Sequence, residues 1–292
     1  MRRLAVLALC LALAPSAAAA APRSVAQAPI RAVEAGQGKV GYRAVGEGRP
    51  LVLIMGLSGT MDAWPPSFVD ALARHRRVVV YDNEGIRRTT RGPDPLTVSR
   101  MADDAASLIR ALHLRRPDVL GWSMGGMVAQ SLARRHPQRV RRLVLCATAP
   151  GDGAGTLPPP DVLSELSDPT GASGVFSQLF PTSRKAGERY LAQILSYPKT
   201  SPSAPGAVTQ AQFAASGAWL LGGDASGRRL GTLRVRTLVG SGGLDRLLPT
   251  ANQRYLARRL PRARLRLYRD AGHGFLFQHQ RDFVGEISRF LR

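Results

Sequence analysis

Short apolar runs and segments of helical periodicity alternate along most of this chain. The apolar runs predict strands near residues 40–45, 50–55, 77–82, 118–122, 142–147, 235–240 and 264–268. Apolar residues at helical spacing predict helices near residues 67–74, 98–112, 124–135, 250–260 and 277–291. Strands that alternate with helices in this way are typical of a mostly parallel sheet with helices on both faces. The pattern therefore predicts an α/β fold.

The alternation stops between about residues 150 and 226. A stretch rich in glycine and proline, residues 151–160, leads into helical segments with large apolar side chains. These side chains are Phe176, Leu179, Phe180, Tyr190, Leu191, Ile194, Leu195, Phe213, Trp219 and Leu220. Such a stripe most often serves plain packing, and it also suits the roof of a binding pocket. We expect a helical insertion within one domain that covers residues 22–292.

A Gly-x-Ser-x-Gly pattern, made by Gly121, Ser123 and Gly125, lies between a predicted strand and a predicted helix. A serine hydroxyl is a weak nucleophile, and a tight turn with small neighbours can expose its Oγ to a base. With 30 glycines in 292 residues the pattern alone often arises by chance. The strand before it and the helix after it are the setting that a nucleophile turn requires. Ser123 is therefore the candidate nucleophile.

Two loops further along the chain can supply a base and an acid. Asp245 follows an apolar strand end and a glycine turn, and His273 lies between two glycines after the last predicted strand. The order Ser, Asp, His is that of one of the three common serine hydrolase designs. The competing acids are Asp82, Asp152, Asp224 and Asp270. Only Asp245 follows a strand where it would face the turn at Ser123.

These motifs together resemble the α/β-hydrolase superfamily, in the branch of lid-bearing esterases and haloperoxidase-like enzymes. The likeness covers about residues 30–292, and it includes a Gly-x-x-Asp-x-x-x-Pro turn at residues 242–249 and a Gly-His-Gly-Phe segment at residues 272–275. The resemblance implies a catalytic triad of Ser123, His273 and Asp245. It also implies a helical lid at about residues 150–226.

The same resemblance implies an oxyanion hole formed by the backbone N–H groups of Met124 and Leu57. Many relatives carry His-Gly where this chain has Met55 and Gly56. The second donor therefore stays open between Gly56, Leu57 and Ser58, with Leu57 as our choice.

A serine nucleophile with this triad predicts hydrolysis of a small-molecule carboxylic ester, or of a similar acyl bond, through an acyl-enzyme. Ser123 excludes the mechanisms of relatives that use a carboxylate nucleophile. Aminopeptidase-like, lipase-like and cofactor-free perhydrolase activities are the alternatives, because fold and triad do not determine the substrate. Peptidase relatives often have Trp where this chain has Met124, which favours an esterase. A non-catalytic binding protein on the same fold is the alternative from another class.

One segment departs from the family pattern. After the predicted strand at 77–82, relatives usually carry Asp-x-Arg-Gly-x-Gly-x-Ser, whereas this chain has Arg87 in place of the second glycine. Arginines in charge-rich runs are usually solvated. We therefore expect Arg87 to be an exposed side chain in a rerouted loop, and we assign it no role.

The formal net charge of +21 would suit a nucleic-acid ligand, but the arginines are scattered over many predicted elements instead of forming a stripe. We therefore expect no nucleic-acid partner. The histidines outside the candidate triad, at positions 75, 113, 136 and 279, lack a second His or Cys at ligand spacing, so no metal and no cofactor is predicted. The sequence does not determine the oligomeric state.

The first 21 residues have the pattern of a secretory signal peptide, with Arg2 and Arg3, an apolar run from Leu4 to Leu13 and a cluster of alanines. The apolar run is too short to span a bilayer, and no later segment could span one. We therefore expect a secreted or cell-envelope protein. Its remaining cysteine, Cys146, lies in a predicted strand and is expected to be a buried, inert side chain.

We predict that the exported protein begins between about Ala20 and Arg23, because small residues at that point suit cleavage after the apolar run. Intact-mass spectrometry of secreted material checks this. A chain that retains Met1, or one that carries a lipid on Cys10, would contradict the prediction.

Overall fold

The computed structural model describes residues 24–167, 177–198 and 202–292. The expected signal peptide, residues 1–21, and Phe176 lie outside the described residues. Within the described chain, no helix is long and apolar enough to cross a membrane.

The described residues contain an eight-stranded sheet with the order β1-β2-β4-β3-β5-β6-β7-β8. The strands are β1 (Arg31–Ala35), β2 (Gly38–Val45), β3 (Pro50–Ile54), β4 (Arg77–Tyr81), β5 (Asp118–Trp122), β6 (Arg142–Cys146), β7 (Arg236–Gly242) and β8 (Ala263–Tyr268). The pairs β1–β2 and β2–β4 are antiparallel, and the other pairs are parallel. The predicted α/β class is confirmed. The sequence pattern missed β1 because this edge strand is largely exposed and carries no apolar run.

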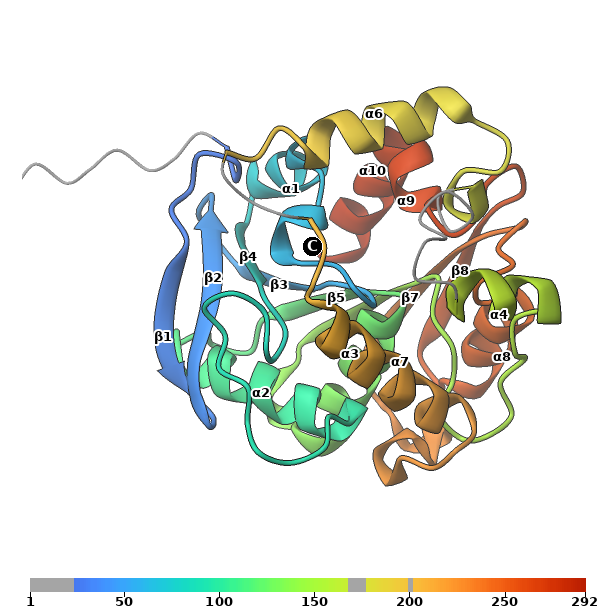
Figure 1. Ribbon diagram of the computed structural model, residues 1–292, viewed down its shortest axis with the longest axis horizontal. Helices are drawn as coiled ribbons and strands as arrows, with labels where there is room; N and C mark the ends of the chain where they lie inside the picture. Colours follow the sequence, from blue (N-terminus) through green and yellow to red (C-terminus); the bar gives the residue numbers. More distant parts are fainter. Residues whose placement is uncertain (1–23, 168–176, 199–201) are drawn as a thin grey trace, which may run out of the picture.

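Helices cover both faces of the sheet (Figure 1). They are α1 (Pro66–Ala73), α2 (Val98–Ala111), α3 (Met124–Arg135), α4 (Pro160–Ser167), α6 (Arg184–Ile194), α7 (Gly206–Leu220), α8 (Ala251–Arg259), α9 (Phe275–Gln278) and α10 (Gln280–Phe290). The expected helix at 277–291 starts earlier and is divided at His279 into α9 and α10.

The alternation of side chains along the strands divides the core into two layers. Leu51 and Leu53 face the layer that contains α1, α6, α9 and α10. Val52 and Ile54 face the layer that contains α2, α3, α7 and α8. Strands buried on both faces are continuously apolar, which is why the sequence pattern located β3, β4, β5 and β6 closely.

The insertion between β6 and β7 contains α4, α6 and α7. Half of its apolar stripe packs inward, since Leu179, Phe180, Tyr190, Ile194 and Trp219 are buried. Leu191, Leu195 and Phe213 are exposed. The expected helical insertion is therefore present, and its stripe serves both packing and an apolar outer surface.

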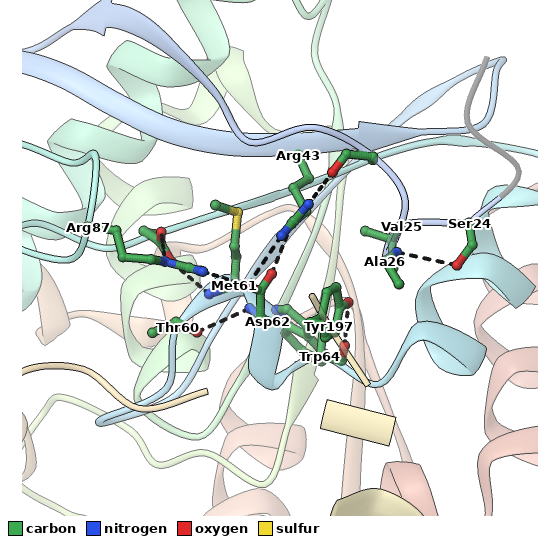
Figure 2. A network of polar contacts seen from close by, with 12 residues as sticks. Ser24, Val25, Ala26, Arg43, Thr60, Met61, Asp62, Trp64, Arg87 and Tyr197 are labelled. Atoms are coloured by element: carbon green, nitrogen blue, oxygen red, sulfur yellow. Dashed lines mark hydrogen bonds and ion pairs between the residues drawn. The ribbon is translucent and has the colours of Figure 1, made fainter. Parts of the chain in front are cut away.

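Arg87 lies in an ion-pair network beside the loop that follows β3 (Figure 2). Its guanidinium donates to both carboxylate oxygens of Asp82, at 2.8 and 2.9 Å, and to Asp62 Oδ2 at 2.5 Å. The residue as a whole is exposed, as expected, but its side chain is only 21% exposed and bonds to two carboxylates instead of being solvated. Two carboxylates that no solvent reaches attract it inward.

The network extends to four parts of the chain. Arg43 of β2 donates from Nε to Asp62 Oδ1 at 2.9 Å, and Asp82 Oδ1 accepts the Met61 N–H at 2.7 Å. The Arg43 guanidinium also lies over the ring of Tyr197, which belongs to the insertion. Burial raises the pKa of the Asp82 carboxyl above its ordinary value although Arg87 bonds to it. The network therefore holds residues 61–62, at the end of the loop after β3, against β2, β4 and the insertion.

We predict that Arg87→Met lowers the free energy of unfolding by about 3 kcal/mol, because it leaves the buried carboxylate of Asp82 without the cation that pairs with it and that of Asp62 with Arg43 alone. Urea denaturation measures the change. The matched control is Arg88→Met at the exposed neighbouring position, with an expected change within about 0.5 kcal/mol. Equal changes for the two variants would contradict a role for the network.

Candidate active site

Ser123 stands at the turn between β5 and α3 with φ 57° and ψ −124°, a strained conformation for a residue with a side chain. Its N–H donates to the Cys146 carbonyl at 2.9 Å, and its carbonyl accepts from the Gly126 N–H at 2.9 Å. A Cβ at Gly121 would lie 2.1 Å from the Gly125 carbonyl oxygen, and one at Gly125 would lie 2.0 Å from that of Ile54. The two glycines are therefore required by the close approach of backbones, and the turn holds Ser123 at the carboxyl end of the central strand.

His273 and Asp245 come together from the loops that follow β8 and β7. His273 Nδ1 lies 2.9 Å from Asp245 Oδ2, and both side chains are buried. The other carboxylate oxygen accepts the Leu248 N–H at 2.9 Å. Because a carboxylate only accepts, Nδ1 carries the proton and Nε2 is left as the basic nitrogen. The two loops pack backbone to backbone, since a Cβ at Gly242 would lie 2.1 Å from the Gly272 carbonyl oxygen.

Trp122 joins the histidine loop to the serine turn, a role that the sequence analysis missed. Its Nε1 donates to the His273 carbonyl at 3.1 Å, and the indole and imidazole rings lie 5.5 Å apart between centroids. Trp122 precedes Ser123 directly, so the same turn that presents the serine also holds the histidine loop. The only signal in the sequence was its place as the first variable residue of the Gly-x-Ser-x-Gly pattern.

The competing acids all have other partners. Asp270 Oδ1 lies 3.0 Å from His279 Nε2, at the surface. Asp82 binds Arg87, Asp152 accepts from the Tyr255 hydroxyl at 2.8 Å, and Asp224 accepts from Ser99. Of the five candidate carboxylates, the structure brings only Asp245 to His273.

The loop after β3 lies against the serine turn. A Cβ at Gly56 would be 3.1 Å from Ser123 Cβ, so the backbone of residue 56 approaches the nucleophile closely. The Ser58 N–H donates to Gln212 Oε1 at 2.8 Å, which leaves Gly56 and Leu57 as candidates for the second oxyanion donor. Met124 is the first residue of α3, where a backbone N–H has no partner within the helix.

The insertion contacts both loops that flank Ser123. The His273 N–H donates to the Gln178 carbonyl at 3.2 Å, and the Gly274 N–H donates to that of Leu179 at 2.9 Å. On the other side, Gly59 pairs with Ser203 in an antiparallel bridge. An open polar hollow of about 490 Å³ lies elsewhere, along residues 278–289, and it contains none of the three candidate residues. The candidate site therefore lies at Ser123, between two loops that the insertion contacts.

Cys146 is fully buried at the end of β6, and burial raises the pKa of its thiol well above the ordinary value. A buried thiol of this kind is inert, which matches the expectation from the sequence.

Comparisons with known proteins agree with the fold. Residues 49–175 match the family described as alpha/beta hydrolase fold. A protein of Caulobacter sp. that is named as a carbamate hydrolase, RutD, is 32% identical over 254 residues, or 82% of this chain and 90% of the relative. The 2-hydroxy-6-oxo-2,4-heptadienoate hydrolase of Pseudomonas putida is 28% identical over 275 residues, or 89% of this chain and 95% of the relative.

Among solved structures, an alpha/beta hydrolase fold protein from Chitinophaga pinensis superposes with a TM-score of 0.80 at 28% identity, covering 91% of this chain and 98% of that one. The chain therefore belongs to the α/β-hydrolase superfamily, and it is a hydrolase.

If Asp245 orients His273, Asp245→Asn favours the wrong imidazole tautomer, and we predict a loss of turnover of roughly 10² to 10⁴. Asp270→Asn is the matched control, because Asp270 lies beside His279 at the surface, and it should change turnover by less than about threefold. Steady-state kinetics on one activated ester, with circular dichroism to confirm folding, compares the two. A greater loss in Asp270→Asn would require a different acid.

Proposed function

We propose that this hydrolase cleaves a carboxylic ester, or a similar acyl bond, of a small molecule through a covalent acyl-enzyme on Ser123. The observation that carries the proposal is the buried His273–Asp245 contact of 2.9 Å, in a loop that Trp122 holds beside the strained serine turn. A serine, a histidine and a carboxylate with these neighbours are the groups that acyl transfer requires.

In this mechanism the Ser123 Oγ attacks the acyl carbon while His273 Nε2 takes the hydroxyl proton. Asp245 holds the imidazole through Nδ1 and stabilises its positive charge. The developing oxyanion accepts hydrogen bonds from the N–H groups of Met124 and Leu57. His273 then gives the proton to the leaving group, and a water activated by the same nitrogen hydrolyses the acyl-enzyme.

One observation favours an ester over a peptide bond, and the names of the relatives favour a small substrate. Met124 occupies the place where peptidase relatives often have Trp. The relatives are named for a carbamate and for an oxo-dienoate, so small acyl compounds are common to both names. We also propose that the protein is exported, on the basis of the signal-peptide pattern at residues 1–21.

We predict that Ser123→Ala lowers ester hydrolysis by about 10³-fold or more, because the nucleophile is lost while the turn and its glycines remain. Hydrolysis of p-nitrophenyl butyrate measures the loss, and a fluorophosphonate probe should label the wild type alone. The control is Ser164→Ala on the exposed side of α4, which should keep both activity and labelling. Retained activity in Ser123→Ala, with labelling of another serine, would refute the assignment.

A further inference from the structure

Gln212 of α7 is a buried polar side chain for which the proposed mechanism has no role. It is 0% exposed, and its Oε1 accepts the Ser58 N–H at 2.8 Å. Within the described residues its Nε2 has no hydrogen-bond partner. The orientation of the amide follows from the chemistry, because a backbone N–H requires the oxygen of the side chain as its acceptor. The NH₂ group is thus the end of the amide that is left to bind something else.

The position of this amide is next to the reaction centre. Gly56, whose backbone approaches Ser123, is two residues before Ser58 in the same loop. Met124 belongs to the same apolar cluster as Ala215 and Trp219 of α7, and Leu57 packs against that cluster. Gln212 therefore places a buried polar side chain on the part of α7 that contacts the loop of Leu57.

The backbone around Ser58 ties α7 to this loop. The Ala204 N–H donates to the Ser58 carbonyl at 2.6 Å, and the Thr60 N–H donates to that of Pro202 at 3.0 Å. Because these bonds fix the backbone around Ser58, the hydrogen bond from the Ser58 N–H holds the side-chain amide of Gln212 in one orientation. A buried donor without a partner is costly, so a fixed and buried NH₂ group beside the loop of the expected oxyanion donor is suited to a substrate oxygen.

We propose that the Gln212 Nε2 donates a hydrogen bond to a second acceptor oxygen in the acyl part of the substrate, such as a ketone or carboxyl oxygen. At the same time its Oε1 positions the loop that supplies Leu57. Gln212 thereby selects oxygen-bearing acyl groups over plain aliphatic ones. This inference rests on the proposed acyl transfer at Ser123 and adds the substrate class to it.

The test compares two substrates that differ by one oxygen-bearing group, p-nitrophenyl valerate and p-nitrophenyl levulinate, in which a ketone interrupts the same chain. Gln212→Glu keeps an oxygen for the Ser58 N–H and replaces the NH₂ donor. Gln212→Met removes both functions. Gln210→Glu is the control, since it makes the same change at an exposed position of α7. The readout is the ratio of kcat/KM for levulinate to that for valerate, which is independent of the folded fraction.

We expect Gln212→Glu to lower kcat/KM for levulinate about tenfold more than that for valerate, as loss of a buried hydrogen bond implies. Gln212→Met should lower both values and should lower levulinate about tenfold more. Gln210→Glu should leave the ratio unchanged. A ratio equal to that of the wild type in both Gln212 variants would overturn the inference and would leave Gln212 as a structural residue.

Failure of the proposed function would look different. In that case the wild-type protein would hydrolyse neither ester and would not react with a fluorophosphonate, whatever residue stands at position 212. In that case the proposed role of Gln212 would be refuted together with the acyl transfer at Ser123.

Discussion

The structure depends on the strained turn at Ser123, which exists only because backbones approach one another without side chains between them. A non-glycine residue at φ 57° and ψ −124° costs about 1–3 kcal/mol, so the surrounding packing must hold it. Gly121 and Gly125 allow the turn to fit under β3, and the neighbouring strand β6 accepts the Ser123 N–H. The backbone of the turn after β5 therefore determines the orientation of Ser123, independently of the other groups of the site.

Each remaining part of the site is positioned from this turn. Trp122 holds the histidine loop through one hydrogen bond and one ring contact, and the histidine loop holds Asp245 through the imidazole. The loop after β3 lies on the other side, where Gly56 packs against Ser123. The mechanism that we propose requires such preorganisation, because a proton must move between groups whose separation hardly changes during the reaction.

The loop after β3 is stabilised from two sides by segments that lie far apart in the sequence. Asp62 and Asp82, with Arg43 and Arg87, fix its far end by ion pairs shielded from solvent. Residues 202–204 of the insertion bind its middle through backbone hydrogen bonds. Any movement of α7 would break bonds to this loop, so the insertion and the expected oxyanion donor are mechanically connected. In our proposal Gln212 therefore positions this loop as well as packing within the protein.

The sequence by itself determined the alternation of strands and helices, the Gly-x-Ser-x-Gly turn and the chain order of serine, aspartate and histidine, because these depend on local periodicity and on the space around glycine. The position of Asp245 after a strand predicted it as the acid. Only the folded chain distinguishes it from Asp270, because Asp245 contacts His273 whereas Asp270 lies beside His279. Tertiary structure alone decided the inward position of Arg87, the link through Trp122 and the orientation of Gln212. These side chains have partners far away in the chain or across a loop, and the free energy of such contacts depends on burial that no local pattern records.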